Sequence, residues 1–203
     1  NEGFLKRIFD YITYMISASF FSLFIKKVDL VIGTSPQFFT VCAAYIVSRY
    51  KRIPFIFELR DIWPESIKAV GAMKDNFIIR VLERLEMFLY SKSSLIVSVT
   101  YSFKQILINR GIPHNKICVI TNGVDTKHYY PLAKDSQLLK TMNLDKKFVI
   151  GYFGTLGMAH ALETILDAAK IIKTIPNGNK VRFILLGDGA RKVDLKDFAK
   201  KNK

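Results

Sequence analysis

The chain is poor in the residues that build metal sites and disulfide frameworks. Its 203 residues include only two cysteines and three histidines. The histidines, at positions 114, 128 and 160, are scattered without metal-ligand spacing, so no metal site is expected. Cys42 and Cys118 each lie in an apolar run, which predicts buried, reduced thiols of a cytoplasmic protein.

Acidic residues are also scarce: 17 Asp and Glu stand against 31 Lys and Arg, a formal charge of +14. Such a balance predicts an anionic partner, which could be nucleic acid, an acidic membrane surface or a phosphorylated substrate. Nucleic acid is disfavoured because the charge is spread over apolar α/β segments without a basic and aromatic binding module. Hydrophobic residues make up 50% of the chain, which is ample for a core.

The apolar stretch 8–25 is short for a membrane span. Its uncharged part, 11–25, has 15 residues, whereas a spanning helix needs about 20. Basic pairs flank the stretch at 6–7 and 26–27. Three interpretations stay open: a buried helix of an α/β domain, a helix lying in the membrane interface, and a true span.

Two common nucleotide-binding fingerprints are missing. The chain has no G-x-x-x-x-G-K-[ST] sequence, which excludes a P-loop nucleotidase. Two glycine turns are present, GTLG at 154–157 and GDGA at 187–190, but neither has the spacing G-x-G-x-x-G. No acidic residue follows at the position that would hold a ribose, so NAD binding is not expected.

Apolar strands alternate with helical segments, as in parallel βαβ units whose strands are buried on both faces. This alternation predicts an α/β fold of two Rossmann-like units: residues 1–130, a linker at 131–146, and residues 147–203. Ser35 is expected to cap the helix 36–50, with Pro36 at its first position. The expected strands are 29–33, 54–59, 94–100, 117–120, 148–153 and 181–186, and the other helices 75–92, 101–110, 161–174 and the charged end.

The GTLG turn connects an apolar strand to a helix expected to start near His160. Glycine lets a ligand approach the main chain, and a helix amino terminus attracts phosphate. An ordinary βα turn is the alternative. With the GDG turn after the next strand, the pair could hold a diphosphate and the rest of a nucleotide; the candidates are Gly154, Thr155, Leu156, Gly157, His160, Gly187, Asp188 and Gly189.

A dense polar cluster, ELRDIWPES, follows the strand 54–59. Ligands of doubly wound folds bind outside the carboxyl ends of the strands, which favours a substrate-facing loop. In the alternative, Arg60 pairs with Glu58 or Asp61 and merely caps the sheet. A turn signal, Asn122-Gly123, follows another strand and could face the same site.

Four motifs in order, ELRDIWPES, VITNGVD, GYFGTLGMAHALE and FILLGDGA, resemble the family 4 retaining glycosyltransferases of the GT-B fold. The likeness is greatest to the bacterial branch that builds O-antigen, capsule and exopolysaccharide. It implies a two-domain enzyme that moves a sugar from a nucleotide-sugar donor to an acceptor hydroxyl with retention and without a metal or other cofactor. It also implies a central fragment, inactive by itself, because the family's first glycine-rich loop and its paired glutamates fall outside residues 1–203.

The resemblance places the donor diphosphate on GTLG and the nucleoside near GDG. Many members carry an Arg after the first glycine and a Lys five residues later, where this chain has Thr155 and His160. His160 and the loop amides would therefore stabilise the leaving group. The acceptor would be oriented by Asp61 or Glu65, in a cleft also lined by Glu58, Arg60, Trp63 and Asn122.

The implied acceptor is a glycan carried on a lipid diphosphate, with the enzyme peripheral on the cytoplasmic face of the inner membrane. The basic charge and the apolar stretch 8–25 fit this expectation. Two other functions stay open. One is a non-enzymatic, basic membrane-surface domain with structural glycine turns, and the other is a GT-B nucleotide-sugar epimerase, which needs no acceptor.

Overall fold

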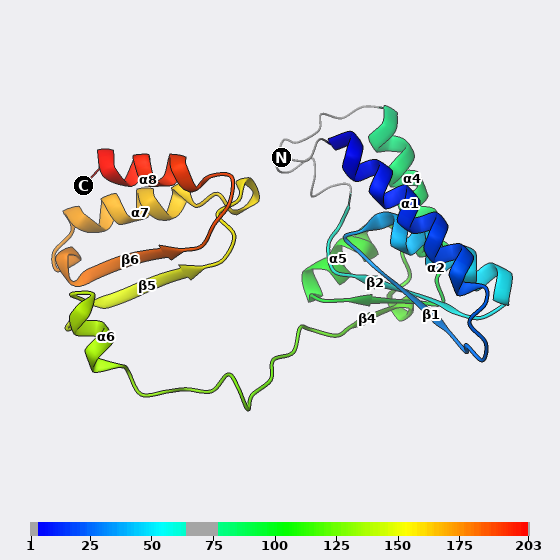
Figure 1. Cartoon of the computed structure of the whole chain (residues 1–203), viewed down its shortest axis with the longest axis horizontal. Helices are drawn as coiled ribbons and strands as arrows, with labels where there is room; N and C mark the ends of the chain where they lie inside the picture. Colours follow the sequence, from blue (N-terminus) through cyan, green and yellow to red (C-terminus); the bar gives the residue numbers. More distant parts are fainter. Residues whose placement is uncertain (1–3, 64–76, 203) are drawn as a thin grey trace. The chain divides into compact units, whose positions relative to one another are not determined.

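The computed structural model describes residues 4–63 and 77–202. The chain forms two compact units, Asn1–Val124 and Asp125–Lys203 (Figure 1). Helix α6, Ser136–Thr141, forms inside the expected linker, and the domain bounds 1–130, 131–146 and 147–203 stay a prediction. The alternation of strands and helices confirms the predicted α/β class.

The first unit contains a parallel sheet in the order β1-β2-β3-β4. Because all four strands run the same way, their carboxyl ends lie at one edge, called here the carboxyl edge. The connections run through helices, as a parallel sheet requires. The strands are β1 Val31–Thr34, β2 Phe55–Leu59, β3 Leu95–Ser98 and β4 Ile117–Val119. The helices between them are α2 Phe38–Lys51, α4 Phe77–Lys92 and α5 Tyr101–Asn109, with a 3₁₀ turn at His114–Lys116.

The sheet is not buried equally on both faces, which corrects the expectation from its apolar strands. In β2 the burial alternates: Phe55, Phe57 and Leu59 are fully buried and the residues between them only partly. Ile32 on β1 is 54% exposed. Cys118 on β4 is exposed, so only Cys42 is buried as predicted. One face of the sheet therefore carries the main core.

Helix α1, Phe4–Ser22, packs along α2 but is not a buried helix. Met15 packs toward the core, whereas Phe9, Phe20 and Phe21 on the same helix are exposed. Within the described part of the chain, no helix is both long and apolar enough to cross a membrane. Because the side chains of Phe9, Phe20 and Phe21 are exposed, the interpretation of 8–25 as a buried helix is wrong. The interpretation as a helix in the membrane interface stays a prediction.

Helix α2 begins two residues later than its sequence indicates. Gln37 is the N-cap, and its side chain accepts from the Thr40 amide at 2.8 Å. Ser35 does not cap the helix, because its hydroxyl is bound to the chain that follows β2.

The second unit contains a parallel two-stranded sheet of β5 Phe148–Phe153 and β6 Val181–Leu186. Helices α7 Glu163–Thr174 and α8 Lys192–Lys201 lie on one side of the strands in Figure 1. Short 3₁₀ turns occur at Met158–His160 and Gly178–Lys180. The buried centre of the unit consists of Leu156, Leu162 and Leu195.

Candidate functional site

Side chains from three segments join at the carboxyl edge of the first unit. At the end of β1, the Thr34 hydroxyl donates to the Glu58 carboxylate of β2 at 2.6 Å. The Arg60 guanidinium donates to the Asn122 side-chain oxygen beyond β4 at 3.1 Å. Among the described residues, Arg60 does not pair with Glu58 or Asp61. The structure thus brings Arg60 and Asn122 together, as a shared site requires.

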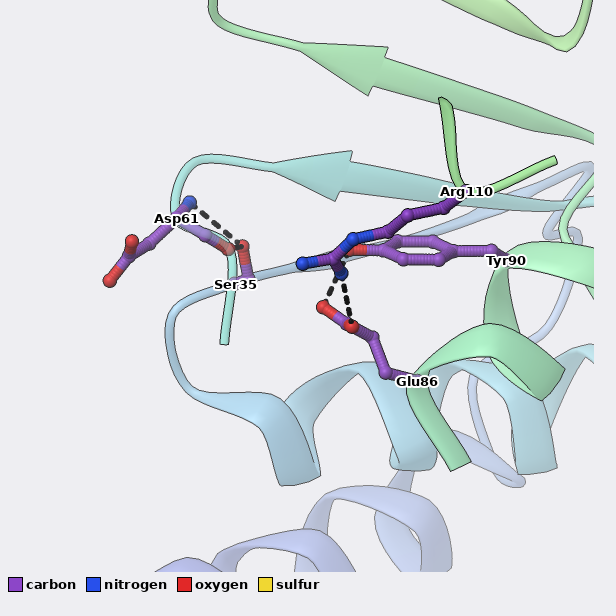
Figure 2. A network of polar contacts seen from close by, with 5 residues as sticks. All are labelled: Ser35, Asp61, Glu86, Tyr90 and Arg110. Carbon is purple, nitrogen blue, oxygen red and sulfur yellow. Dashed lines mark hydrogen bonds and ion pairs between the residues drawn. The ribbon is translucent and has the colours of Figure 1, made fainter. Parts of the chain in front are cut away.

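Ser35 ties the end of β1 to the first residues after β2 (Figure 2). Its hydroxyl accepts from the amides of Arg60 at 3.0 Å and Asp61 at 3.2 Å and donates to the Asp61 carbonyl at 3.1 Å. Ser35 is 2% exposed. The Asp61 carboxylate points away from Ser35 (Figure 2).

Trp63 lies closer to the core than a cleft residue would. Its ring stacks on Phe38, with centroids 4.8 Å apart and planes 24° apart. It is only partly buried, so one part of the indole remains open to solvent. Glu65, the other predicted acceptor-orienting residue, lies outside the described residues.

The two glycine turns of the second unit pack directly against each other. The Leu156 amide donates to the Asp188 carbonyl at 2.8 Å, and the Arg191 amide donates to the Leu156 carbonyl at 2.9 Å. A Cβ on Gly187 would lie 1.8 Å from the Gly154 oxygen, closer than any side chain tolerates. The main chains can therefore meet only because residue 187 is glycine.

The paired glycine turns leave amide donors for a ligand. The Gly154 amide donates to Leu186 and the Leu156 amide to Asp188. Among the described residues, the amides of Thr155 and Gly157 have no acceptor within the protein. Two free N–H groups on one short loop can bind an anion.

His160 does not begin the following helix, which corrects the sequence prediction. Residues 158–160 form a 3₁₀ turn, Ala161 has φ +45°, and α7 begins at Glu163. The left-handed residue interrupts the helical path, and the Thr164 amide donates back to Ala161 at 3.0 Å. His160 is exposed and its ring meets that of Tyr152 edge-on, with centroids 6.1 Å apart. It lies beside the loop as a separate donor.

The charged groups around the turns have distinct roles. The Gly189 amide and then Lys192 hold the pKa of Asp188 below its usual range, so this exposed carboxylate is ionised. An ionised carboxylate accepts hydrogen bonds from hydroxyl groups but repels phosphate oxygens. The pKa of Glu163 is also lowered, first by its hydrogen bond from Arg191. This pair ties α7 to the segment that follows GDG.

Sequence reasoning missed a buried polar cluster of Glu86, Tyr90 and Arg110 (Figure 2). The Glu86 carboxylate accepts from the Tyr90 hydroxyl at 2.7 Å and from Arg110 at 3.2 Å. A signal was present, because Glu86 occupies a core position at helical spacing between Ile79 and Leu89. A carboxylate there requires partners. No group of three His, Cys, Asp or Glu in the described ranges could hold a metal.

The fold of the chain matches that of GT-B proteins. The solved structure of HepE from Anabaena with UDP and glucose has a TM-score of 0.64 at 19% identity, over 98% of this chain and 49% of that one. MnaA of S. aureus with UDP reaches 0.52 at 15% identity, over 100% of this chain and 51% of that one. Residues 5–128 match the model of Glycosyltransferase Family 4, so the chain belongs to this family.

Two curated relatives carry glycosyltransferase names. The probable glycosyltransferase WbjE of Pseudomonas aeruginosa is 25% identical over 86% of this chain and 43% of its own length. The second, from Campylobacter jejuni, is N,N'-diacetylbacillosaminyl-diphospho-undecaprenol alpha-1,3-N-acetylgalactosaminyltransferase, 23% identical over 70% of this chain and 38% of its own length. The chain therefore spans less than half the length of the curated relatives it matches.

Proposed function

We propose that the full-length protein transfers a sugar from a nucleotide-sugar donor to a lipid-diphosphate-linked glycan, with retention, in cell-surface polysaccharide synthesis. Family membership supports the transfer. The complex of HepE with UDP-glucose supports a nucleotide-sugar donor, and the name of the Campylobacter relative supports a lipid-diphosphate acceptor. Retention, and the absence of a metal, rest on the resemblance of the motifs.

The observation that carries this proposal is the packing of the two glycine turns. It leaves the amides of Thr155 and Gly157 free on the loop that also holds His160. As the glycosidic bond to the donor breaks, negative charge develops on the leaving diphosphate. Donors already in place stabilise this charge without reorganising, and removing one costs on the order of 10²-fold in turnover.

The carboxyl edge of the first unit supplies the acceptor side of the proposal. The carboxylate of Asp61 or Glu65 accepts a hydrogen bond from the acceptor hydroxyl and orients it toward the donor sugar. Glu58, Arg60, Trp63 and Asn122 shape the same side. Asp188, which is ionised, accepts from hydroxyl groups of the nucleoside and not from the diphosphate.

Helices α1 and α2 support attachment to an anionic bilayer. An almost wholly apolar groove between them is lined by Met15, Ile16, Ser19, Phe20, Leu23, Ile46 and Tyr50. Lys51 donates to the carbonyls of Leu23 at 3.1 Å and Ile25 at 2.7 Å, which brings the basic end of α2 to Lys26 and Lys27. Apolar side chains beside clustered cations complement acyl chains beside lipid phosphates. Protein on the cytoplasmic membrane face would meet its lipid-linked acceptor there.

The test of the transferase is a panel of UDP-, GDP- and dTDP-sugars with membrane extract as acceptor, using full-length protein. His160→Ala should lower turnover about 10²-fold and leave Tm unchanged, because the ring is exposed. The matched control is His114→Ala, an exposed histidine in the 3₁₀ turn before β4. Near-normal turnover of His160→Ala would overturn its role.

The other functions give different results in the same assays. An epimerase would alter the nucleotide sugar with no acceptor present. A non-enzymatic membrane domain would sediment with phosphatidylglycerol vesicles and not with neutral ones, but would transfer nothing. Phe20→Asp should weaken sedimentation with anionic vesicles, and unchanged sedimentation contradicts the proposed surface.

A further inference from the structure

Among the described residues of the first unit, four buried serines divide between the two edges of its sheet. Ser48 and Ser93 lie before β2 and β3, where their hydroxyls donate to Ile53 at 2.7 Å and Tyr90 at 2.9 Å. Ser35 and Ser98 lie at the carboxyl edge. Ser98 bonds to Thr100, close to it in the chain, whereas Ser35 bonds to a segment 25 and 26 residues away.

The hydroxyl of Ser35 is used to its full capacity. A serine hydroxyl offers one donor and two acceptor positions. Here the donor goes to the Asp61 carbonyl, and the acceptor positions take the amides of Arg60 and Asp61. Ser35 is 2% exposed, so there is little room for a larger side chain at this position. Few other side chains could bind these three backbone groups there.

The backbone held by Ser35 is the part from which the acceptor-side groups extend. The Arg60 side chain donates a hydrogen bond to Asn122 beyond β4. The Asp61 carboxylate points away from the Ser35 hydroxyl (Figure 2). The neighbouring Thr34 bonds to Glu58. Thr34, the last residue of β1, and Ser35, the first residue after it, therefore fix both the last part of β2 and the chain that leaves it.

We infer that Ser35 is a positioning residue, which sets the direction of Arg60 and Asp61 toward the acceptor. The inference rests on the proposed function, since the role of Asp61 in orienting the acceptor belongs to it. Ser35 touches no substrate in this account. It acts by holding the two amides and one carbonyl, so that the side chains of residues 60 and 61 keep one direction.

The experiment compares Ser35→Ala with Ser48→Ala in full-length protein. Both remove one buried hydroxyl bonded to backbone, but Ser48 lies at the opposite edge of the sheet. Hydrogen exchange read on peptides covering Arg60 and Asp61 should accelerate about tenfold in Ser35→Ala and stay unchanged in Ser48→Ala. The KM for lipid extracted from membranes, used as the acceptor probe, should rise about tenfold or more, with the KM for the donor sugar unchanged.

Each outcome decides the inference. Ser35→Thr keeps the hydroxyl and should restore both the exchange rate and the acceptor KM, and if Ser35→Ala does not fold, Ser35→Cys replaces it, because sulfur is a weak acceptor. A fall in Tm with unchanged acceptor KM would show a purely structural role and overturn the inference. If wild-type protein transfers no sugar from any donor, the proposed function fails and the acceptor role of Ser35 fails with it. Unchanged hydrogen exchange at residues 60 and 61 would refute the claim that the Ser35 hydroxyl holds this backbone, whatever the activity of the enzyme.

Discussion

The buried carboxylate of Glu86 should make the first unit depend strongly on Arg110. Glu86 is 2% exposed and accepts from Arg110 at 3.2 Å and from Tyr90 at 2.7 Å. Removing one partner of a buried ion pair costs about 3–5 kcal/mol, because the remaining charge stays out of water. The Arg110 side chain is itself 27% exposed, so we expect Arg110→Ala to cost about 3 kcal/mol of unfolding free energy.

Tyr90→Phe is a smaller change in the same cluster. It removes one hydroxyl that donates to a charged acceptor, which costs about 1.5–3 kcal/mol, and the ring keeps its contact with Phe57 at 4.7 Å. Because Tyr90 and Arg110 share Glu86, the double variant should not be additive. The coupling energy should be about 0.5–3 kcal/mol.

Trp63 provides the assay for this prediction. It is the only tryptophan of the chain and stacks on Phe38 in the core of the first unit. Urea unfolding followed by its fluorescence therefore reports on that unit. Arg84→Ala is the control, since Arg84 is an exposed arginine on α4, the helix that carries Glu86 and Tyr90. The reasoning is refuted if Arg110→Ala costs no more than this control.

Three further predictions concern thiols, glycines and pH. Burial raises the pKa of the Cys42 thiol to about 11, so a thiol reagent at pH 8 should label exposed Cys118 and reach Cys42 only after denaturation, as mass spectrometry of the peptides would show. Gly187→Ala should destabilise the second unit by about 3 kcal/mol or more, whereas Gly123→Ala, whose Cβ would meet nothing within 4 Å, should leave the first unit unchanged in thermal unfolding. Arg191 holds the pKa of Glu163 below its ordinary value of 4.5, so this stabilisation is present above pH 4.5 and lost as the pH falls through the folded value. Glu163→Gln should therefore be less stable than wild type at pH 7, and in acid unfolding the two should converge as the pH falls through the lowered folded pKa of Glu163; a constant difference contradicts the pairing.

Local pattern was sufficient for the order of strands and helices. Apolar runs such as 148–153 and 181–186 became strands with the expected limits, because periodicity and glycine turns are short-range signals. The GTLG and GDG turns could be placed at neighbouring strand ends for the same reason. Their direct packing, with Leu156 bonded to Asp188, depends on the register of β5 and β6 and is not a local property.

The residues that sequence reasoning placed wrongly have partners far along the chain. Ser35 before Pro36 has the local pattern of a helix cap, but its hydroxyl is taken by residues 60 and 61. Gln37 then caps the helix. His160 was expected at a helix start, and the positive φ of Ala161 displaced that start to Glu163. A short local pattern cannot show which of these alternatives the folded chain adopts.

The loops at the carboxyl ends of the strands are held in place by different contacts in the two units. This difference has a consequence for the specificity of the enzyme toward its acceptor. In the second unit the close contact of main chains requires glycine at 187, where a Cβ would lie 1.8 Å from the Gly154 oxygen. Hardly any substitution is possible there without moving the loop. In the first unit Ser35 holds the backbone, while the side chains of Arg60 and Asn122 make the contacts. Those side chains can change without disturbing their support. If the proposed function holds, changes of acceptor should therefore arise at residues such as 60 and 122, and the diphosphate loop should stay constant.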